Sequence, residues 1–297
     1  MVDTATTGSR DMGATSRRLA GVIILLAAAL TAVAHAHVPL KRLQDQDRTV
    51  YVAPRTYFGG MEYLPPQGPR TQVTAAYGVY GSLLVPLKPV LDKVFLFGDA
   101  DFLAGPEHGE FDWIATQYQY GVGWRFLPDW AIKFTGSRHD LDTPLKTMEL
   151  GGPDCVVWNA PSLEYQPWIS CPWATARADL EFYVFPPHNE YDPNPATAWP
   201  DRVVARYAAD VSVLLDEICH SKFYAAARAF LPLGDSRPKV HNWQADPIAL
   251  FWQARVGWRA TDSLSIYLEY AHVNDLGGIA NSRELQSTLS LALACSF

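Results

Sequence analysis

The last nine residues, LSLALACSF (Leu289–Phe297), decide the fold. Their odd-numbered positions carry large apolar side chains or cysteine, and their even-numbered positions carry only serine and alanine. A period of two is the pattern of a β-strand whose two faces meet different surroundings. One face suits hydrocarbon, whereas the other is small and weakly polar. The pattern therefore predicts a strand in the wall of a β-barrel that has lipid on its outside.

The start of the chain has the features of an export signal. Arg17-Arg18 precede the apolar run LAGVIILLAAALTAV (Leu19–Val33), and Ala34-His35-Ala36 follows it. A basic region, a short apolar stretch and an A-x-A site are typical of a secretory signal peptide. The run is too short for a spanning helix, which needs ~20 apolar residues. We therefore expect residues 1–36 to be a signal peptide that is cleaved before His37.

Composition and periodicity favour an all-β chain. The sequence has 297 residues, 48% of them hydrophobic, and a formal net charge of −7. This charge, without a basic patch, disfavours nucleic acid as a partner. Apolar and polar residues alternate over segments of about ten to fifteen residues, longer than the ~5–6 residues of most globular strands. In lipid only a closed barrel pairs every backbone group of a sheet, so we expect a closed antiparallel transmembrane barrel.

Counting the alternating segments predicts about twelve strands. They are expected at 48–57, 70–85, 93–102, 113–126, 130–139, 156–163, 173–185, 201–215, 222–233, 248–259, 263–273 and 283–297. The first and sixth have the weakest patterns, so ten strands is the alternative count. Tight turns are predicted at 127–129 and 260–263, and long polar segments at 105–112, 140–154, 186–200 and 232–247. Short turns at one end and long loops at the other are typical of outer-membrane barrels.

The final strand also carries a family resemblance. Leu293, Cys295 and the terminal Phe297 resemble the assembly signal of Gram-negative outer-membrane β-barrel proteins. This resemblance implies an outer-membrane location, contact with outer-membrane lipid and recognition by the barrel assembly machinery. It also implies that residues 37–297 form a single barrel domain, with residues 37–47 as a periplasmic N-terminal segment, short periplasmic turns and longer extracellular loops.

Charged residues alternate with apolar residues, which predicts a charged lumen. The expected lumen charges are Arg125, Lys133, Arg177, Asp179, Glu181, Arg202, Arg206, Asp210, Arg228, Arg255 and Glu269. Four of them (Arg177, Asp179, Arg206 and Asp210) lie on neighbouring predicted strands and are expected to form an inward-facing ladder. Such charges fill a narrow barrel and line a channel in a wider one. We therefore predict a small passive pore or a structural barrel, and no cofactor or metal; the sequence leaves the oligomeric state open.

One segment suggests chemistry. GSRHDLDT (Gly136–Thr143) resembles the His-Asp-Ser segment of outer-membrane phospholipase A, although Leu141 stands where that family has its serine. Ser137, His139 and Asp142 supply the residue types of a serine hydrolase. The alternative function is therefore a lipid hydrolase, of phospholipase or lipid A deacylase type. Alternation, however, points Ser137 and His139 into the lumen, whereas a lipid hydrolase must face lipid, so we expect that the protein is not an enzyme.

The four cysteines allow three complete pairings in an exported chain. Cys171 precedes one predicted strand and Cys219 follows the next, so both lie at the same end of adjacent antiparallel strands. This arrangement favours a Cys171–Cys219 disulfide, with Cys155 and Cys295 as thiols. A Cys155–Cys171 bridge is the alternative, but it would remove the sixth predicted strand.

Overall fold

The protein is described by a computed structural model that covers residues 50–58, 61–63, 71–73, 77–87, 93–107, 110–141, 155–186, 204–235, 246–275 and 287–297. The chain divides into two units, Met1–Ala32 and Val33–Phe297, and every described residue belongs to the second. The described elements are strands, apart from one short 3-10 turn, η1 (Ile218–His220). Among the described residues, no helix has the length and apolar character needed to cross a membrane.

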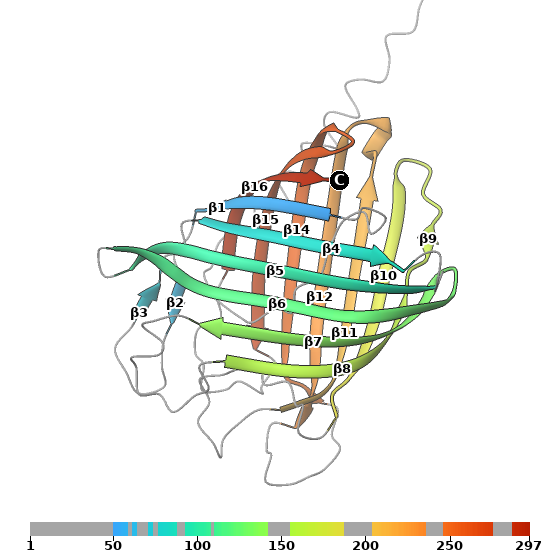
Figure 1. Cartoon of the computed structure of the whole chain (residues 1–297). Coiled ribbons are helices and arrows are strands. Elements are labelled where there is room, and N and C mark those ends of the chain that lie inside the picture. The colour runs from blue at the N-terminus through green and yellow to red at the C-terminus, as the bar shows by residue number, and fades with distance from the viewer. Residues whose placement is uncertain are drawn as a thin grey trace, which may run out of the picture. The chain divides into compact units, whose positions relative to one another are not determined.

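The strands form one closed ring (Figure 1). Its members in chain order are β1 (Val50–Tyr57), β4 (Tyr77–Pro86), β5 (Val94–Glu107), β6 (Glu110–Leu127), β7 (Trp130–Leu141), β8 (Cys155–Tyr165), β10 (Thr175–Val184), β11 (Val204–Asp216), β12 (Phe223–Asp235), β14 (Ala249–Thr261), β15 (Leu264–Asp275) and β16 (Ser287–Ser296). Each pairs antiparallel with the next, and β1 pairs with β16 to close the ring. The predicted closed antiparallel barrel of about twelve strands is confirmed.

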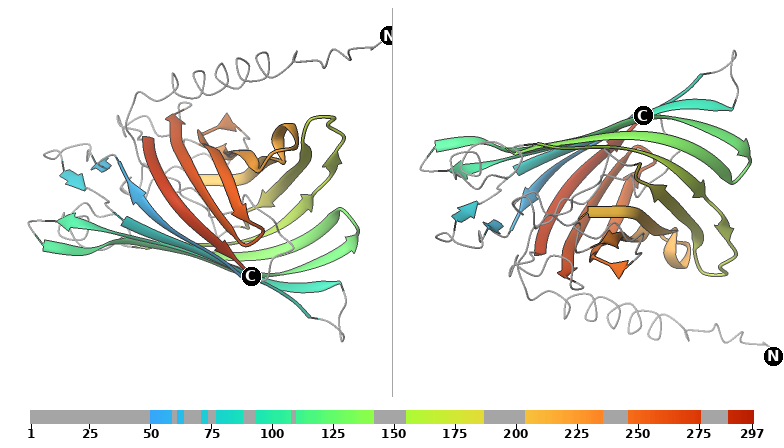
Figure 2. Two further views of the ribbon diagram at one scale, coloured as in Figure 1. Left: turned by 90° about the horizontal axis from the view of Figure 1, so that it is seen from above. Right: turned by 90° about the horizontal axis from the view of Figure 1, so that it is seen from below.

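Four short strands lie outside the ring. β2 (Met61–Tyr63) and β3 (Thr71–Val73) pair with each other. β9 (Trp168–Ile169) extends the sheet beside β10, and β13 (Asp246–Pro247) does the same beside β12. Views from above and below show β14–β16 opposite β5–β7, so the single sheet wraps around on itself (Figure 2).

The connections sort to two ends. Two-residue turns join β6 to β7 and β14 to β15, as predicted, and the short connections from β8 to β10 and from β11 to β12 lie at the same end. Most segments outside the described residues follow strands that end on the opposite side. The prediction of a long loop at 105–112 is wrong, because β5 and β6 remain paired as far as Glu107 and Glu110.

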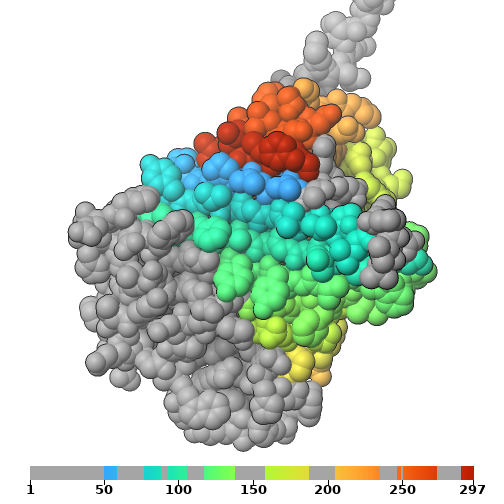
Figure 3. Space-filling model, viewed as in Figure 1, coloured from blue at the N-terminus to red at the C-terminus, as the bar shows by residue number. Residues whose placement is uncertain are grey.

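The two faces of the wall differ as the final strand predicted. In β16, Leu291 and Leu293 are 43% and 45% exposed, whereas Ser290, Ala292 and Ala294 are buried. The outward side chains of β4 to β7 form a continuous surface (Figure 3), and many of them are large and apolar. They include Val79, Leu83, Leu96, Tyr120, Val122, Trp124, Ile132 and Phe134. An apolar exterior around a closed ring is the architecture of a transmembrane barrel.

The seam between β1 and β16 closes the sheet at its last residue. The Phe297 backbone N–H donates to the Val50 carbonyl at 2.9 Å, and the Val50 N–H donates to the Phe297 carbonyl at 3.2 Å. Without this pair, backbone groups at the edge would face the membrane without partners.

We expect deletion of Phe297 to impair barrel assembly, because it removes both terminal bonds of the closing seam and the last outward aromatic side chain. The measurement is the amount of heat-modifiable barrel in membranes on denaturing gels. Phe182→Ala, which removes an outward aromatic from β10, is the control. Normal amounts of barrel after the deletion would contradict this role for the seam.

Candidate functional site: the polar interior

The interior of the barrel is the candidate site, because its inner wall carries buried ion pairs. Arg55 on β1 pairs with Asp101 on β5 and, at 3.3 Å, with Glu269 on β15. Arg255 on β14 holds the other Glu269 oxygen, with nitrogen–oxygen distances of 2.5 and 3.0 Å. In this group of four residues, the Arg55 cluster, Arg255 and Glu269 lie on adjacent strands, whereas Arg55 reaches strands that do not pair with β1.

Small residues beside Arg55 explain its reach. Arg55 lies opposite Gly78 on β4 and opposite Ala292 on β16. Neither neighbour has a side chain long enough to block the guanidinium, so it contacts carboxylates two strands away on both sides. The small face of the C-terminal strand therefore makes room for the interior ion pairs.

A second pair is more deeply buried. On adjacent strands, Arg228 Nε lies 2.9 Å from Asp210 Oδ1 and Nη2 lies 2.5 Å from Oδ2. The exposed fractions of the two side chains are 1% and 0%. A bidentate arginine–carboxylate pair satisfies both groups with defined geometry, which a charge pair needs when it is removed from water.

A third cluster surrounds Lys133 on β7. Its ammonium lies 3.0 Å from Glu164 on β8 and 2.8 Å from Glu181 on β10. The Ser162 hydroxyl donates to the second Glu181 oxygen at 2.5 Å. Lys133 therefore joins three successive strands of the ring through one ammonium group.

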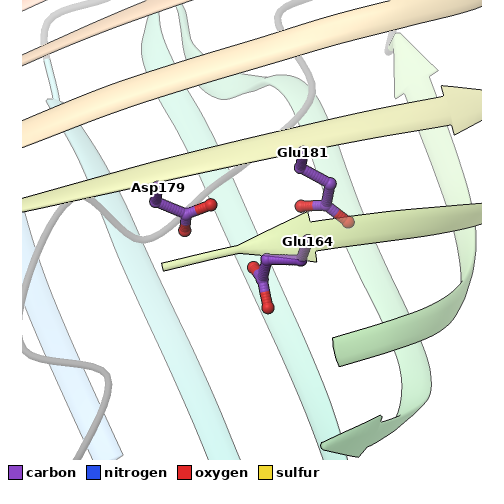
Figure 4. A group of neighbouring side chains, drawn as sticks. All are labelled: Glu164, Asp179 and Glu181. Carbon is purple, nitrogen blue, oxygen red and sulfur yellow. The ribbon is translucent and has the colours of Figure 1, made fainter. Parts of the chain in front are cut away.

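Asp179 completes this region. The Gln166 amide donates to Asp179 at 3.2 Å, and its carbonyl oxygen accepts from Arg177 at 3.0 Å. Glu164, Asp179 and Glu181 each offer an oxygen within 4.8 Å of the others, a grouping compatible with a metal ion (Figure 4). The Lys133 ammonium, however, bonds two of these three carboxylates and supplies the positive charge that a metal would bring.

Aromatic side chains form a buried cluster on the inner wall near the end that carries the long segments. Trp158 on β8 packs edge-to-face against Phe185 at 5.4 Å between ring centroids. Tyr183 contacts Phe230 at 6.2 Å, and Phe230 contacts Phe251 at 5.8 Å. All five belong to one buried cluster, the aromatic plug, that draws on β8, β12, β14 and the end of β10.

The predicted lumen residues are distributed unevenly among these features. Seven of them lie in the buried clusters described above: Lys133, Asp179, Glu181, Asp210, Arg228, Arg255 and Glu269. Arg125 is half-buried, 5.7 Å from the centre of the Phe95 ring. Arg206 lies at the register irregularity between Ala205 and Tyr207, so its place in the predicted charge ladder stays a prediction. Arg202 lies outside the described residues.

Sequence reasoning missed two central residues, Arg55 and Glu164. Arg55 follows Tyr51 and Ala53 at intervals of two residues, so the alternation of this strand already predicts that Arg55 points inward. Glu164 follows the predicted end of the sixth strand by one residue. The structure continues β8 to Tyr165, and this places Glu164 directly opposite Glu181.

The proposed hydrolase residues are only partly visible. Ser137 is buried on the inner wall, and its hydroxyl donates to the Tyr118 carbonyl at 3.4 Å. The side chain of His139 and all of Asp142 lie outside the described residues. The inward position of Ser137 keeps its hydroxyl away from the outer surface, where lipid substrates would lie.

Comparison with known proteins adds a general likeness of fold. No family model matches the chain, and no curated protein matches it. The KdgM porin covers 84% of this chain and 99% of its own, at 8% identity and a TM-score of 0.44. The NanC porin covers 84% and 98%, at 12% identity and a TM-score of 0.46. The Salmonella typhi outer membrane phospholipase dimer with bound calcium covers 84% and 90%, at 10% identity and a TM-score of 0.46.

Three of the four cysteines have described side chains, and none of these three forms a disulfide in the structure. Cys171, Cys219 and Cys295 are free thiols, whereas the side chain of Cys155 lies outside the described residues. The Cys219 backbone N–H donates to the Trp173 carbonyl at 2.6 Å, so Cys219 packs against the segment that follows Cys171.

We predict that oxidation joins Cys171 to Cys219, because the two lie on neighbouring short connections at the same barrel end. Peptide mapping of protein from an oxidising compartment, under non-reducing conditions, measures the pairing. Cys295→Ala should leave the bridged peptide unchanged. A Cys155–Cys171 peptide in its place would contradict the prediction.

The Arg228–Asp210 pair predicts a strong asymmetry between single and double substitutions. Arg228→Leu should lower the free energy of unfolding by ~3–5 kcal/mol, because Asp210 is left charged and buried without its partner. The double variant with Asp210→Leu should recover much of that loss. Reversible unfolding in denaturant measures both. Equal losses from the single and double variants would show that the charge pairing is unimportant.

Proposed function

We propose that the protein is an integral outer-membrane barrel whose lumen is closed in its resting state, so that it acts as a structural barrel and not as an open pore. The observation that carries this proposal is the burial of the Arg228–Asp210 pair inside the ring. Residues that line an open aqueous channel keep contact with water. Here a charge pair on the inner wall has almost none.

The aromatic plug supports the same conclusion. Its rings come from β8, β10, β12 and β14, which with β11 form one continuous arc of the ring, and they pack against one another along the inner face of that arc. Buried ion pairs occupy further parts of the inner wall. Interiors of small barrels are filled by side chains, whereas an open channel requires a wider ring.

The apolar exterior supports the membrane location. A closed ring leaves no unpaired strand edge, and its outward apolar residues match hydrocarbon. The predicted export signal and the C-terminal strand support the outer membrane as the destination, with assembly by the barrel assembly machinery. The short turns then lie in the periplasm and the long segments outside the cell.

A narrow passive pore is the second candidate function. The observation that favours it is a polar chamber inside the ring, which is bordered by Lys133, Glu164 and Glu181. Movement of the Lys133 side chain away from its two carboxylates would widen this region. A pore of this kind would conduct only after the plug and the ion pairs had rearranged.

The conductance of purified protein in planar bilayers tests the closed state. We expect no regular single-channel steps from the wild type, because the plug and ion pairs obstruct the lumen. Phe230→Ala, which removes the ring that contacts both Tyr183 and Phe251, should produce steps. Phe182→Ala removes an outward ring from a plug-bearing strand and should remain silent. Regular steps from the folded wild type would establish a pore instead.

A further inference from the structure

An internal chamber lies against the inner wall of β4 to β8 and β10. It has a volume of about 70 Å³, and its lining includes Ser82, Phe95, Phe97, Gln119, Lys133 and Thr135. The Lys133 ion pairs and Tyr183 of the aromatic plug border it on one side, and the rest of its lining mixes neutral polar and aromatic groups.

Two glycines on β6 shape the chamber. Gly121 and Gly123 alternate inward with Gln119 and Arg125, and they have no side chains to occupy the space. The rings of Phe97 and Phe95 lie over them so closely that a Cβ atom at either glycine would collide with the ring. The two rings, 6.2 Å apart, form an apolar wall inside a polar interior.

Three neutral polar groups of the lining have no hydrogen-bond partner among the described residues. They are the Ser82 hydroxyl, the Gln119 side-chain amide nitrogen and the Thr135 hydroxyl. Their residues are 7%, 4% and 1% exposed, so bulk water reaches them poorly. Buried polar groups in proteins nearly always have a partner, and the three residues that carry these groups all line the same chamber.

The charged groups of the lining, in contrast, either have a hydrogen-bond or ion-pair partner or are in contact with water. Lys133 bonds Glu164 and Glu181, and Asp99 accepts from the Tyr80 hydroxyl at 2.7 Å. Arg125 is half-buried and keeps access to water. A charged solute would therefore find no buried counter-charge without breaking an existing pair. The groups that lack partners call for an uncharged ligand.

We propose that this chamber binds a small uncharged polyol of about three carbons. A buried water needs ~10–15 Å³ of such volume, so the chamber holds about five waters or a solute of about six non-hydrogen atoms. Ligand hydroxyls satisfy Ser82, Gln119 and Thr135, and the C–H face of the ligand packs on the Phe95 and Phe97 rings. Polyol binding at this site does not depend on whether the lumen is open or closed.

The probe for the test is ¹³C-labelled glycerol, titrated by NMR against the folded barrel in lipid nanodiscs. We expect saturable binding to the wild type. Propane-1,3-diol, which lacks one hydroxyl, should bind more weakly. Glycine, acetate and methylammonium should not compete, because each brings charge to a site whose charges are already paired.

Substitutions locate the site. Gln119→Leu and Thr135→Val should each weaken glycerol binding by about tenfold, because each removes a hydrogen bond in a buried site. Thr175→Val makes the same change at an exposed position outside the chamber and should have no effect. If either chamber variant fails to fold on a heat-modifiability gel, Ser82→Ala replaces it, with the buried Ser212→Ala as control.

The outcomes separate this proposal from the closed-lumen function. Absence of saturable glycerol binding, tighter binding of a charged probe, or equal binding by chamber and control variants would each overturn the polyol site. None of these results depends on conductance, and single-channel steps from the wild type leave the binding result unaffected.

Discussion

The requirement that every backbone N–H and C=O in a lipid-facing sheet find a partner governs this structure. It is met only if the last strand pairs with the first, as β16 does with β1. Closure then fixes a ring with a limited interior. The inward half of every strand must fill that space or line it, and the outward half must be compatible with hydrocarbon.

Closure makes the interior electrostatics demanding. Inward charges enter a space with little water, where an unpaired charge is costly. The Arg55 cluster, the Lys133 cluster and the Arg228–Asp210 pair each meet this demand by joining groups on different strands. Small residues such as Gly78 and Ala292 allow the longer reaches. The small residues thus make room for the long charged side chains, and the resulting ion pairs link different strands of the ring to one another.

Alternation made most of the fold predictable, because a period of two assigns both the strand and its faces. Even the weakly patterned β1 and β8 exist as spanning strands. The contacts between interior side chains were harder to predict from the sequence, because alternation identifies an inward side chain but not its partner. Arg55 and Glu269 are far apart in sequence and meet only after closure. Glu164 was missed at a strand end, and the irregularity at Arg206 interrupts the alternation on which its placement relied.

The need to fill the barrel interior does not explain why the chamber has polar side chains in its lining. Apolar residues at positions 82, 119 and 135 would pack beside Phe95 and Phe97 without leaving polar atoms unsatisfied. Serine, glutamine and threonine there each cost ~1–3 kcal/mol of desolvation when no partner is present. The ion pairs do not require these residues, because Lys133, Glu164 and Glu181 already satisfy one another. The proposed polyol offsets that cost by hydrogen bonding to the polar side chains at these three positions.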